Sequence, residues 1–194
     1  MLGGRTLIEW SVSLLRDAEC SPVIVVVPED ELEAAKAGYA DSEDILIARA
    51  GPSRQASVRN GLEHVATSRV VVHDAASPLA TAEMVRGVLD GLEEADAVTV
   101  GVPLDETVKR VEGGVAIETL DRSGLWRVQT PQAFDTKILK RAHEEALAAG
   151  IEATDDAALV ERLGLPVRVL PGTRRNIKLT YAEDFALAEA IIRG

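Results

Sequence analysis

The chain has 194 residues, a net charge of −11 at pH 7 and a hydrophobic fraction of 46%, which fits one domain with a buried core. Such an acidic chain lacks the basic face that nucleic acids and anionic membranes require, and no apolar run is long enough to cross a bilayer. The single cysteine, Cys20, permits neither an internal disulfide nor a cysteine-rich metal site, and it fits a reducing cytoplasm.

Helical patterns and short apolar runs alternate along the chain. The run Val23–Val27 is continuously apolar and ends at Pro28, which is typical of a strand buried on both faces. In chain order we expect a helix at 7–16, strand 23–27, helix 29–37, strand 45–47, a helix capped by Ser53, strand 70–73, helix 81–95, strand 97–102, helices 137–149 and 156–163, strand 167–170, and a last helix opened by a Thr180–Glu183 capping box. Strands separated by helices predict an α/β fold with a parallel, doubly wound sheet.

One segment departs from this alternation. Residues 106–111 and 115–120 flank Gly113-Gly114, which is a β-hairpin signal. Thr107 and Lys109 are two residues apart and are expected on one face of the first hairpin strand. Because a lone hairpin is marginally stable in water, it packs either on its own sheet or on a partner subunit.

Polar residues at three places are candidate site residues. Asp74 follows strand 70–73, at the edge where open α/β sheets bind ligands, so it either holds a metal ion or ligand hydroxyl or caps the next turn. Gly51 lies ahead of the helix capped by Ser53, where an anion site and an ordinary capped turn have the same pattern. Residues 172–178 form a cationic patch, which indicates either an anion site or a surface turn.

Residues 121–132 hold the densest mixture of polar groups. Arginines, glutamines and hydroxyls stand together with Trp126 and Pro131 in a run with few apolar residues, and we expect a rigid turn in it. Core packing would not select this mixture, whereas a phosphorylated, polyhydroxylated ligand would, because guanidinium groups clamp phosphate oxygens at two points. By contrast, residues 154–156 are typical of a helix start, and His143 belongs to no motif.

Six blocks of residues occur in one order along the chain. They are Gly51-x-x-Arg54-x-x-Ser57-Val58, His73-Asp74-Ala75-Ala76-x-Pro78, Thr107-Val108-Lys109-Arg110, Asp121-Arg122-x-Gly124-Leu125-Trp126-x-x-Gln129-Thr130-Pro131-Gln132, Thr154-Asp155 and Asn176-Ile177-Lys178. This series resembles the 2-C-methyl-D-erythritol 4-phosphate cytidylyltransferase family of the non-mevalonate isoprenoid pathway. The fourth block is highly specific, and the resemblance runs from Met1 to the C-terminus.

The resemblance implies a single domain, 1–194, with a Rossmann-like, doubly wound, mostly parallel sheet of the nucleotide-diphospho-sugar transferase type. A β-hairpin arm at about 103–124 protrudes from it and is exchanged across a homodimer. The implied reaction is attack by the phosphate of methylerythritol phosphate on the α-phosphorus of CTP, which gives CDP-methylerythritol and pyrophosphate. The implied cofactor is Mg²⁺ or another divalent cation carried by CTP, and no metal ligands are expected in the chain.

The resemblance also implies roles for individual residues. Arg122 and Lys178 match catalytic residues that hold the acceptor phosphate, and Thr154 contacts the same phosphate. Asp74 contacts the acceptor's hydroxyls, and Thr130 belongs to the same substrate-binding group. Gly51 and Ser57 match contacts to the cytosine and the nearby ribose. Thr107 and Arg122 match arm residues that reach the partner's site.

The chain also departs from the family pattern. Family members open with a buried strand, a Pro-Ala-Ala-Gly-type loop with a catalytic arginine, and a lysine in Pro-Lys-Gln, whereas Met1 corresponds to the stretch after that lysine. Because that strand is central in the family's sheet, we expect unpaired backbone on both neighbouring strands and an apolar groove. Ser77 stands where the family usually has arginine, and Pro52 removes an N–H at a nucleotide-facing turn.

The missing loop carries most of the family's triphosphate contacts, so we expect the 194 residues to be inactive or nearly so. The intact later blocks favour a gene product that is this cytidylyltransferase and begins upstream of Met1. Two other functions remain open. One is an inactive binding or dimerisation remnant, and the other is a cytidylyltransferase for another polyol phosphate, such as ribitol 5-phosphate.

Overall fold

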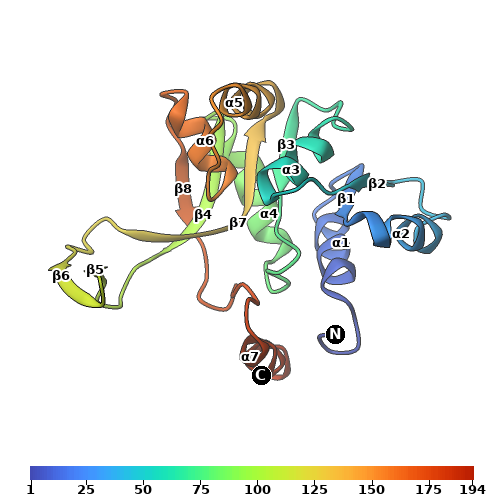
Figure 1. Cartoon of the computed structure of the whole chain (residues 1–194). Coiled ribbons are helices and arrows are strands. Elements are labelled where there is room, and N and C mark those ends of the chain that lie inside the picture. The colour runs from blue at the N-terminus through green and yellow to red at the C-terminus, as the bar shows by residue number, and fades with distance from the viewer.

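The computed structural model describes all 194 residues, and Figure 1 shows the order of their helices and strands. The helices are α1 (Leu7–Asp17), the 3₁₀ helix η1 (Glu29–Glu31), α2 (Leu32–Gly38), α3 (Arg54–Leu62), α4 (Ala82–Gly91), α5 (Thr136–Ala148), α6 (Asp156–Arg162) and α7 (Ala182–Arg193). The strands are β1 (Val23–Val27), β2 (Ile45–Arg49), β3 (Arg69–Val72), β4 (Ala97–Pro103), β5 (Lys109–Glu112), β6 (Val115–Thr119), β7 (Trp126–Asp135) and β8 (Arg168–Pro171). None of the helices is both long enough and apolar enough to cross a bilayer.

The main strands form two sheets. β1 pairs with β2 in parallel, and the other sheet has the order β3-β7-β4-β8. Within that sheet β3, β4 and β8 run in one direction, while β7 is antiparallel to both of its neighbours. The predicted α/β fold with mostly parallel strands is therefore confirmed, with β7 as the exception.

The sequence pattern did not predict β7, and the turn expected in 121–132 is wrong for its second half. From Trp126 onwards the chain is a strand that pairs with both β3 and β4. The register with β4 shifts where Gln132 faces Thr99 and Gln129 faces Val100, so Thr130 and Pro131 form a bulge. A proline has no N–H to donate, and a bulge accommodates this loss within a paired strand.

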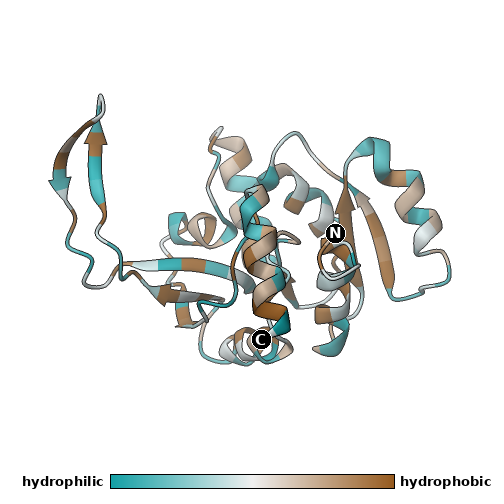
Figure 2. Ribbon diagram, turned by 90° about the horizontal axis from the view of Figure 1, so that it is seen from below, coloured by the Kyte–Doolittle hydropathy of each residue, from teal (hydrophilic) through white to brown (hydrophobic).

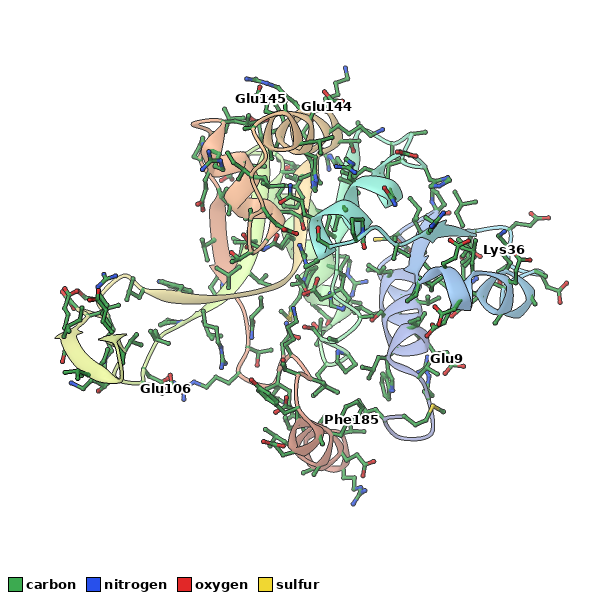
Figure 3. All side chains as sticks on the ribbon, in the orientation of Figure 1. Glu9, Lys36, Glu106, Glu144, Glu145 and Phe185 are labelled. Carbon is green, nitrogen blue, oxygen red and sulfur yellow. The ribbon has the colours of Figure 1, made fainter.

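Helices cover both faces of the larger sheet, as Figure 1 shows. Ala97 packs with Phe134 and Leu139 in a cluster that includes side chains of α5 and α6. The next residue, Val98, points to the other face and packs with Val88 of α4. Successive strand residues point to opposite faces of a sheet. A strand covered by apolar layers on both faces is therefore apolar along most of its length, as β4 is. Figure 3 places the exposed Glu144 and Glu145 on the outer side of α5.

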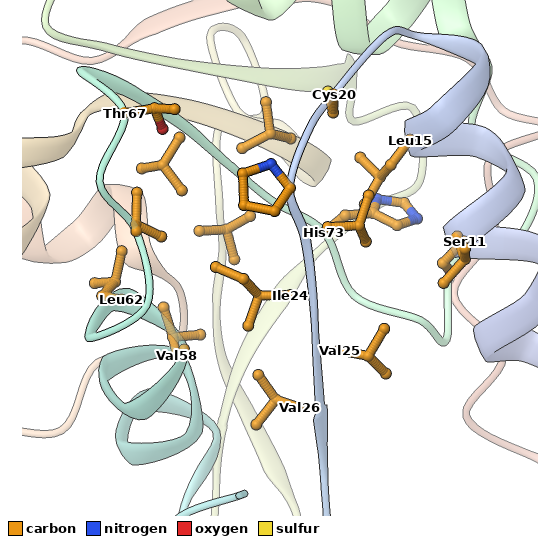
Figure 4. Close-up of a pocket in the computed structure, with 18 of the residues that line it drawn as sticks. Ser11, Leu15, Cys20, Ile24, Val25, Val26, Val58, Leu62, Thr67 and His73 are labelled. Atoms are coloured by element: carbon orange, nitrogen blue, oxygen red, sulfur yellow. The ribbon is translucent and has the colours of Figure 1, made fainter. Parts of the chain in front are cut away.

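An apolar groove separates the two sheets. β1 pairs only with β2, and β3 pairs only with β7, so each has an edge without a partner strand. Both edges line one groove of about 560 Å³, together with apolar side chains of α1 and α3 (Figure 4). The groove that the family pattern led us to expect is present.

The hairpin forms and projects away from the sheets (Figures 1 and 2). Its turn is Gly113-Gly114, with φ of 55° and 82°, the left-handed region that glycine tolerates best. Thr107 precedes β5 instead of lying in it, because the first strand begins at Lys109, later than expected. Every residue of β5 and β6 is exposed, and both strands carry hydrophobic positions (Figure 2).

Outside the hairpin, most element boundaries lie within two residues of the prediction, and three differences are larger or change a helix cap. The helix after Pro28 begins as the 3₁₀ turn η1, and α4 ends at Gly91, four residues early. The last helix is capped by Asp184 and not by Glu183, because the Asp184 Oδ2 accepts hydrogen bonds from the N–H groups of Thr180 and Tyr181, at 2.7 Å each. The carboxylate that caps the helix is thus one residue later than the spacing predicted.

Candidate active site

Asp74 lies between two cations at the carboxyl end of β3. Its Oδ1 accepts a hydrogen bond from Arg54 Nε at 3.0 Å, and its Oδ2 accepts one from Lys178 Nζ at 2.6 Å. Arg54 is the first residue of α3, and Lys178 lies in the loop between β8 and α7. Three segments that are distant in sequence therefore meet at one carboxylate.

The two cations determine the charge of Asp74. Burial by itself raises the pKa of the Asp74 carboxyl, but Arg54 and Lys178 outweigh it and hold the pKa below its usual range. The turn that follows Asp74 is closed by its backbone, because the Ser77 N–H donates to the Asp74 carbonyl at 2.8 Å. The Asp74 carboxylate is therefore ionised at neutral pH and held by cations instead of capping the turn.

A buried ion pair lies behind Arg54. Arg54 Nη1 donates to Asp156 Oδ2 at 2.8 Å, and the other oxygen of Asp156 lies 2.9 Å from His143 Nε2. The side chains of Asp156 and His143 are only 1% exposed. His143, which belongs to no sequence motif, thus contacts the same carboxylate as Arg54, and no spacing in the sequence connects positions 54, 143 and 156.

Residues 154–156 do form a helix start, as expected, and the two adjacent aspartates there make different contacts. Asp155 is the N-cap of α6 and accepts a hydrogen bond from the Ala158 N–H at 3.0 Å. Asp156 points inward to Arg54 and His143. Thr154 is exposed just ahead of this cap.

Polar residues of β7 hold the Lys178 loop against the end of β3. Thr130 is buried, and its Oγ1 accepts a hydrogen bond from the Asp74 N–H at 3.2 Å. The Thr130 carbonyl accepts one from Asn176 Nδ2 at 2.9 Å. Gln129 Nε2 donates to the carbonyls of Thr173 and Asn176, at 2.8 Å each. The polar run after Arg122 therefore positions Asp74 and Lys178 through backbone contacts.

Gly51 and Ser57 lie together where α3 begins. The Gly51 N–H donates to Ser57 Oγ at 3.0 Å, and Ser57 Oγ donates to the Ser53 carbonyl at 2.8 Å. Ser53 caps α3 as predicted, since its side chain accepts from the Ala56 N–H. A Cβ on residue 51 would lie 2.5 Å from the Ala56 Cβ, so the turn requires glycine. Arg54 connects this turn with Asp74.

Thr107 and Arg122 do not join this group within one chain. Both lie on the exposed arm, which points away from the sheets in Figure 1, and Arg122 Nη1 donates to the Asp105 carbonyl. Figure 3 labels Glu106 in this part of the arm. Arg174 pairs with Asp105, and Arg175 donates to the Ile191 carbonyl. Of the cationic patch at 172–178, only Lys178 contacts Asp74.

His73 lies beside the site and lines the groove (Figure 4). Both ring nitrogens are buried without a hydrogen-bond partner. Burial lowers the pKa of His73 to about 4, so the ring is neutral at pH 7. The chain has no cluster of three or more His, Cys, Asp or Glu side chains that could hold a metal ion.

Comparison with known proteins decides the family. The sequence model of 2-C-methyl-D-erythritol 4-phosphate cytidylyltransferase matches residues 1–194. This chain belongs to that family. The enzyme of this name from Geobacillus thermodenitrificans is 40% identical over 98% of this chain and 86% of its own length. That from Bacillus velezensis is 43% identical over 91% of this chain and 78% of its own length.

Solved structures of the family share the fold. The cytidylyltransferase from Thermus thermophilus matches with a TM-score of 0.88 and 35% identity, covering 100% of this chain and 92% of that one. The 4-diphosphocytidyl-2C-methyl-D-erythritol synthase from Anaerococcus prevotii matches with a TM-score of 0.91 and 27% identity, covering 100% and 88%. The resemblance drawn from the six blocks is confirmed. Family membership makes the chain a nucleotidyltransferase and does not favour a binding remnant or a different acceptor.

Proposed function

We propose that the protein transfers CMP from CTP to 2-C-methyl-D-erythritol 4-phosphate. A phosphate oxygen of the acceptor forms a bond to the α-phosphorus of CTP, and the bond from that phosphorus to the bridging oxygen breaks. The bond's electrons leave with pyrophosphate, and no proton transfer is required because the attacking oxygen is anionic. The observation that carries this proposal is the Asp74–Lys178 pair, held by Arg54 and β7 at the sheet edge of a chain from this family.

Two sides of the site have separate tasks in this reaction. Lys178 is 56% exposed, so its ammonium group is accessible to the acceptor phosphate, and Thr154 supplies a hydroxyl to the same phosphate. Asp74 accepts hydrogen bonds from the acceptor's hydroxyls. Gly51 and Ser57 face the nucleotide at the start of α3. Such a reaction depends mainly on positioning and on neutralising charge.

We also propose that two chains pair through their arms, so that Thr107 and Arg122 of each chain serve the site of the other. Two observations support this proposal. Residues of β5 and β6 such as Val111, Val115 and Ile117 are exposed and apolar, and an isolated hairpin needs a surface to cover it. Arg122 also has no place at the Asp74 group of its own chain, although its guanidinium suits phosphate.

The proposed metal is Mg²⁺ that arrives with CTP as part of the substrate. Asp74, the carboxylate at the site, is engaged by Arg54 and Lys178, and no cluster of metal ligands stands elsewhere. Mg²⁺ commonly binds substrate phosphates and waters with few protein ligands, and there it neutralises phosphate charge. We place the reaction in the cytoplasm, which the single cysteine fits. We propose no nucleic-acid or membrane partner, and the net charge of −11 supports this part of the proposal.

A single-turnover assay tests the proposed reaction. Protein in excess over CTP is mixed with methylerythritol phosphate and Mg²⁺, and CDP-methylerythritol and pyrophosphate are quantified. Enzyme excess is chosen because the sequence leads us to expect these 194 residues to be inactive or nearly so. We expect equal amounts of both products, only when both substrates are present. Replacement Lys178→Met should weaken acceptor binding roughly tenfold or more, since a charged hydrogen bond to phosphate is lost.

The matched control is Lys36→Met on α2, which removes an exposed lysine paired with Glu33 and should leave product formation unchanged. Absence of product with any acceptor, both from these 194 residues and from a chain extended upstream of Met1, would favour a binding remnant. Faster transfer to ribitol 5-phosphate would favour a different polyol phosphate as substrate. Either result contradicts the proposed function.

A further inference from the structure

Five side chains form one continuous polar row from the core to the site. It begins at His143, whose Nε2 lies 2.9 Å from Asp156, and continues through Arg54 to Asp74 and Lys178. His143 and Asp156 are 1% exposed, Arg54 is 32% exposed and Lys178 is 56% exposed. The residues come from α5, α6, α3, the end of β3 and the loop before α7.

Arg54 contacts two carboxylates of the row through different edges of its guanidinium. Its guanidinium uses Nη1 for Asp156, while Nε bonds to Asp74 and Nη2 lies 2.9 Å from the same Asp74 oxygen. Asp156 is buried, so it cannot exchange Arg54 for water, and His143 holds its second oxygen. Because the guanidinium is planar, contacts on two of its edges fix its orientation.

The consequence for Asp74 is that its two oxygens have different partners. Oδ1 is taken by Arg54, so only Oδ2 is left for Lys178. The Lys178 ammonium has three donors, and Asp74 occupies one of them. The exposed side of Lys178 therefore keeps donors for a phosphate.

We propose that Arg54, held from behind by Asp156 and His143, is a positioning residue for the acceptor phosphate. By binding one oxygen of Asp74, it prevents this carboxylate from pairing with Lys178 through both oxygens. Lys178 then remains available to the phosphate. This inference rests on the proposed function, since it assigns the phosphate to Lys178.

The charges of the row support the same assignment. Arg54 contacts both Asp74 and Asp156, whereas Lys178 contacts only Asp74, so removal of Arg54 leaves Asp74 with one cation and Asp156 with none beyond its contact to His143. Burial alone lowers the pKa of Arg54, but Asp156 and Asp74 outweigh it and raise the pKa, so the guanidinium stays charged. Without Arg54, the pKa of Asp74 should rise, because burial raises this pKa and Lys178 alone would then oppose it.

The test combines Arg54→Gln with Arg54→Lys and needs two readouts. The first is the pKa of the Asp74 carboxyl, measured by carbon NMR on protein without ligand. The second is the dissociation constant for methylerythritol phosphate, measured by calorimetry. For Arg54→Gln we expect a higher pKa of Asp74 and roughly tenfold weaker binding. Arg54→Lys should give intermediate values, because it restores the charge but not the planar fork.

A double substitution separates positioning from general stability. In protein that already carries Lys178→Met, Arg54→Gln should cause little further loss of phosphate binding, because both changes act on one interaction. The matched control is Arg141→Gln, which breaks an exposed Arg141–Glu145 pair on α5 and should change neither readout. Thermal unfolding of every variant verifies that it is folded.

Two outcomes would overturn the inference. One is an unchanged pKa of Asp74 in Arg54→Gln, and the other is a loss of binding that adds fully to that of Lys178→Met. If the unaltered protein does not bind methylerythritol phosphate at all, the proposed function fails. The pKa of Asp74 still shows in that case whether Arg54 controls this carboxylate.

Discussion

At the scale of single residues, His73 and Asp74 are adjacent in sequence but have opposite surroundings. The two ring nitrogens of His73 are buried beside the apolar groove, and neither has a hydrogen-bond partner. Asp74 is also largely buried, yet Arg54 and Lys178 contact it directly. Burial favours the neutral imidazole, whereas two cations favour the ionised carboxylate. The edge of β3 therefore presents a neutral group and an anion side by side at pH 7.

His73 should make the folded protein sensitive to mild acid. Burial lowers the pKa of His73 from 6.5 to about 4, so between these values the unfolded chain binds a proton that the folded chain does not. Stability therefore falls as the pH falls from about 6.5 to 4, by about 3 kcal/mol in total. In His73→Gln this part of the pH dependence should disappear. Urea unfolding at several pH values measures it.

The matched control for this prediction is His64→Gln, which replaces an exposed imidazole and should retain the slope of the unaltered protein. The ionised Asp74 acts mainly below this window, because its stabilising contribution is lost as the pH falls from its ordinary pKa of 3.8 towards its lowered pKa in the folded protein. Equal slopes in His73→Gln and in the unaltered protein would show that the ring of His73 is hydrated in solution.

Gly51 is sterically required at the start of α3. The added Cβ of Gly51→Ala would lie 2.5 Å from the Ala56 Cβ and 2.8 Å from the Ala56 carbonyl carbon. We expect a loss of about 1–3 kcal/mol in the free energy of unfolding and weaker CTP binding, because the turn that orients Ser57 must shift. The control is Gly87→Ala on α4, where nothing lies within 4 Å and alanine favours the helix. Similar losses in both variants would contradict a local clash.

At the scale of elements, β7 joins the arm to the site. Its first residues follow the arm directly, and its later residues Gln129 and Thr130 bond to the Lys178 loop and to Asp74. One strand thus carries contacts from the projecting hairpin to the center of the larger sheet. The arm and the residues Asp74 and Lys178 are therefore linked through one continuous strand.

The two sheets should differ in local stability. β1 has one partner strand in a two-stranded sheet, whereas β8 is an edge strand of the four-stranded sheet. We expect the bonded amides of β1 to exchange with deuterium at least roughly tenfold faster than those of β8, because small sheets open more easily. Hydrogen exchange followed by mass spectrometry measures this difference. Equal protection would mean that the two sheets open as one unit.

At the scale of the whole molecule, the proposed pairing of arms makes each site depend on two chains. We call the part of each chain outside the arm its body. Lys178→Met disables the acceptor-binding group on the body, and Arg122→Ala disables the one on the arm. Neither variant alone should bind the acceptor well, but mixing them should restore sites built from the intact body of one and the intact arm of the other. With random exchange at equal amounts, roughly a quarter of the sites should recover.

The control mixes Lys178→Met with Asp74→Asn, both on the body, and should restore nothing. Ultracentrifugation of each mixture reports the oligomeric state. Recovery in neither mixture, from a protein that is monomeric, would contradict the exchange of arms. Unimpaired acceptor binding by Arg122→Ala alone would return Arg122 to a surface role.

Local patterns in the sequence determined most elements of this protein and its family. The apolar run Val23–Val27 is a strand with these bounds, and Ser53 caps α3 as expected. These features depend on neighbours within a few residues, so the sequence alone specifies them. The hairpin at Gly113-Gly114 and the six ordered blocks likewise needed no knowledge of the fold.

Only the tertiary structure decided which polar residues meet. The sequence did not predict β7, because this segment is polar and contains Pro131. It is a strand because it pairs with β3 and β4, which are distant in sequence. Arg54, Asp156 and His143 come together for the same reason, since the packing of α3, α5 and α6 defines their distances. Burial and charge pairing are properties of three-dimensional neighbours, and sequence spacing does not encode them.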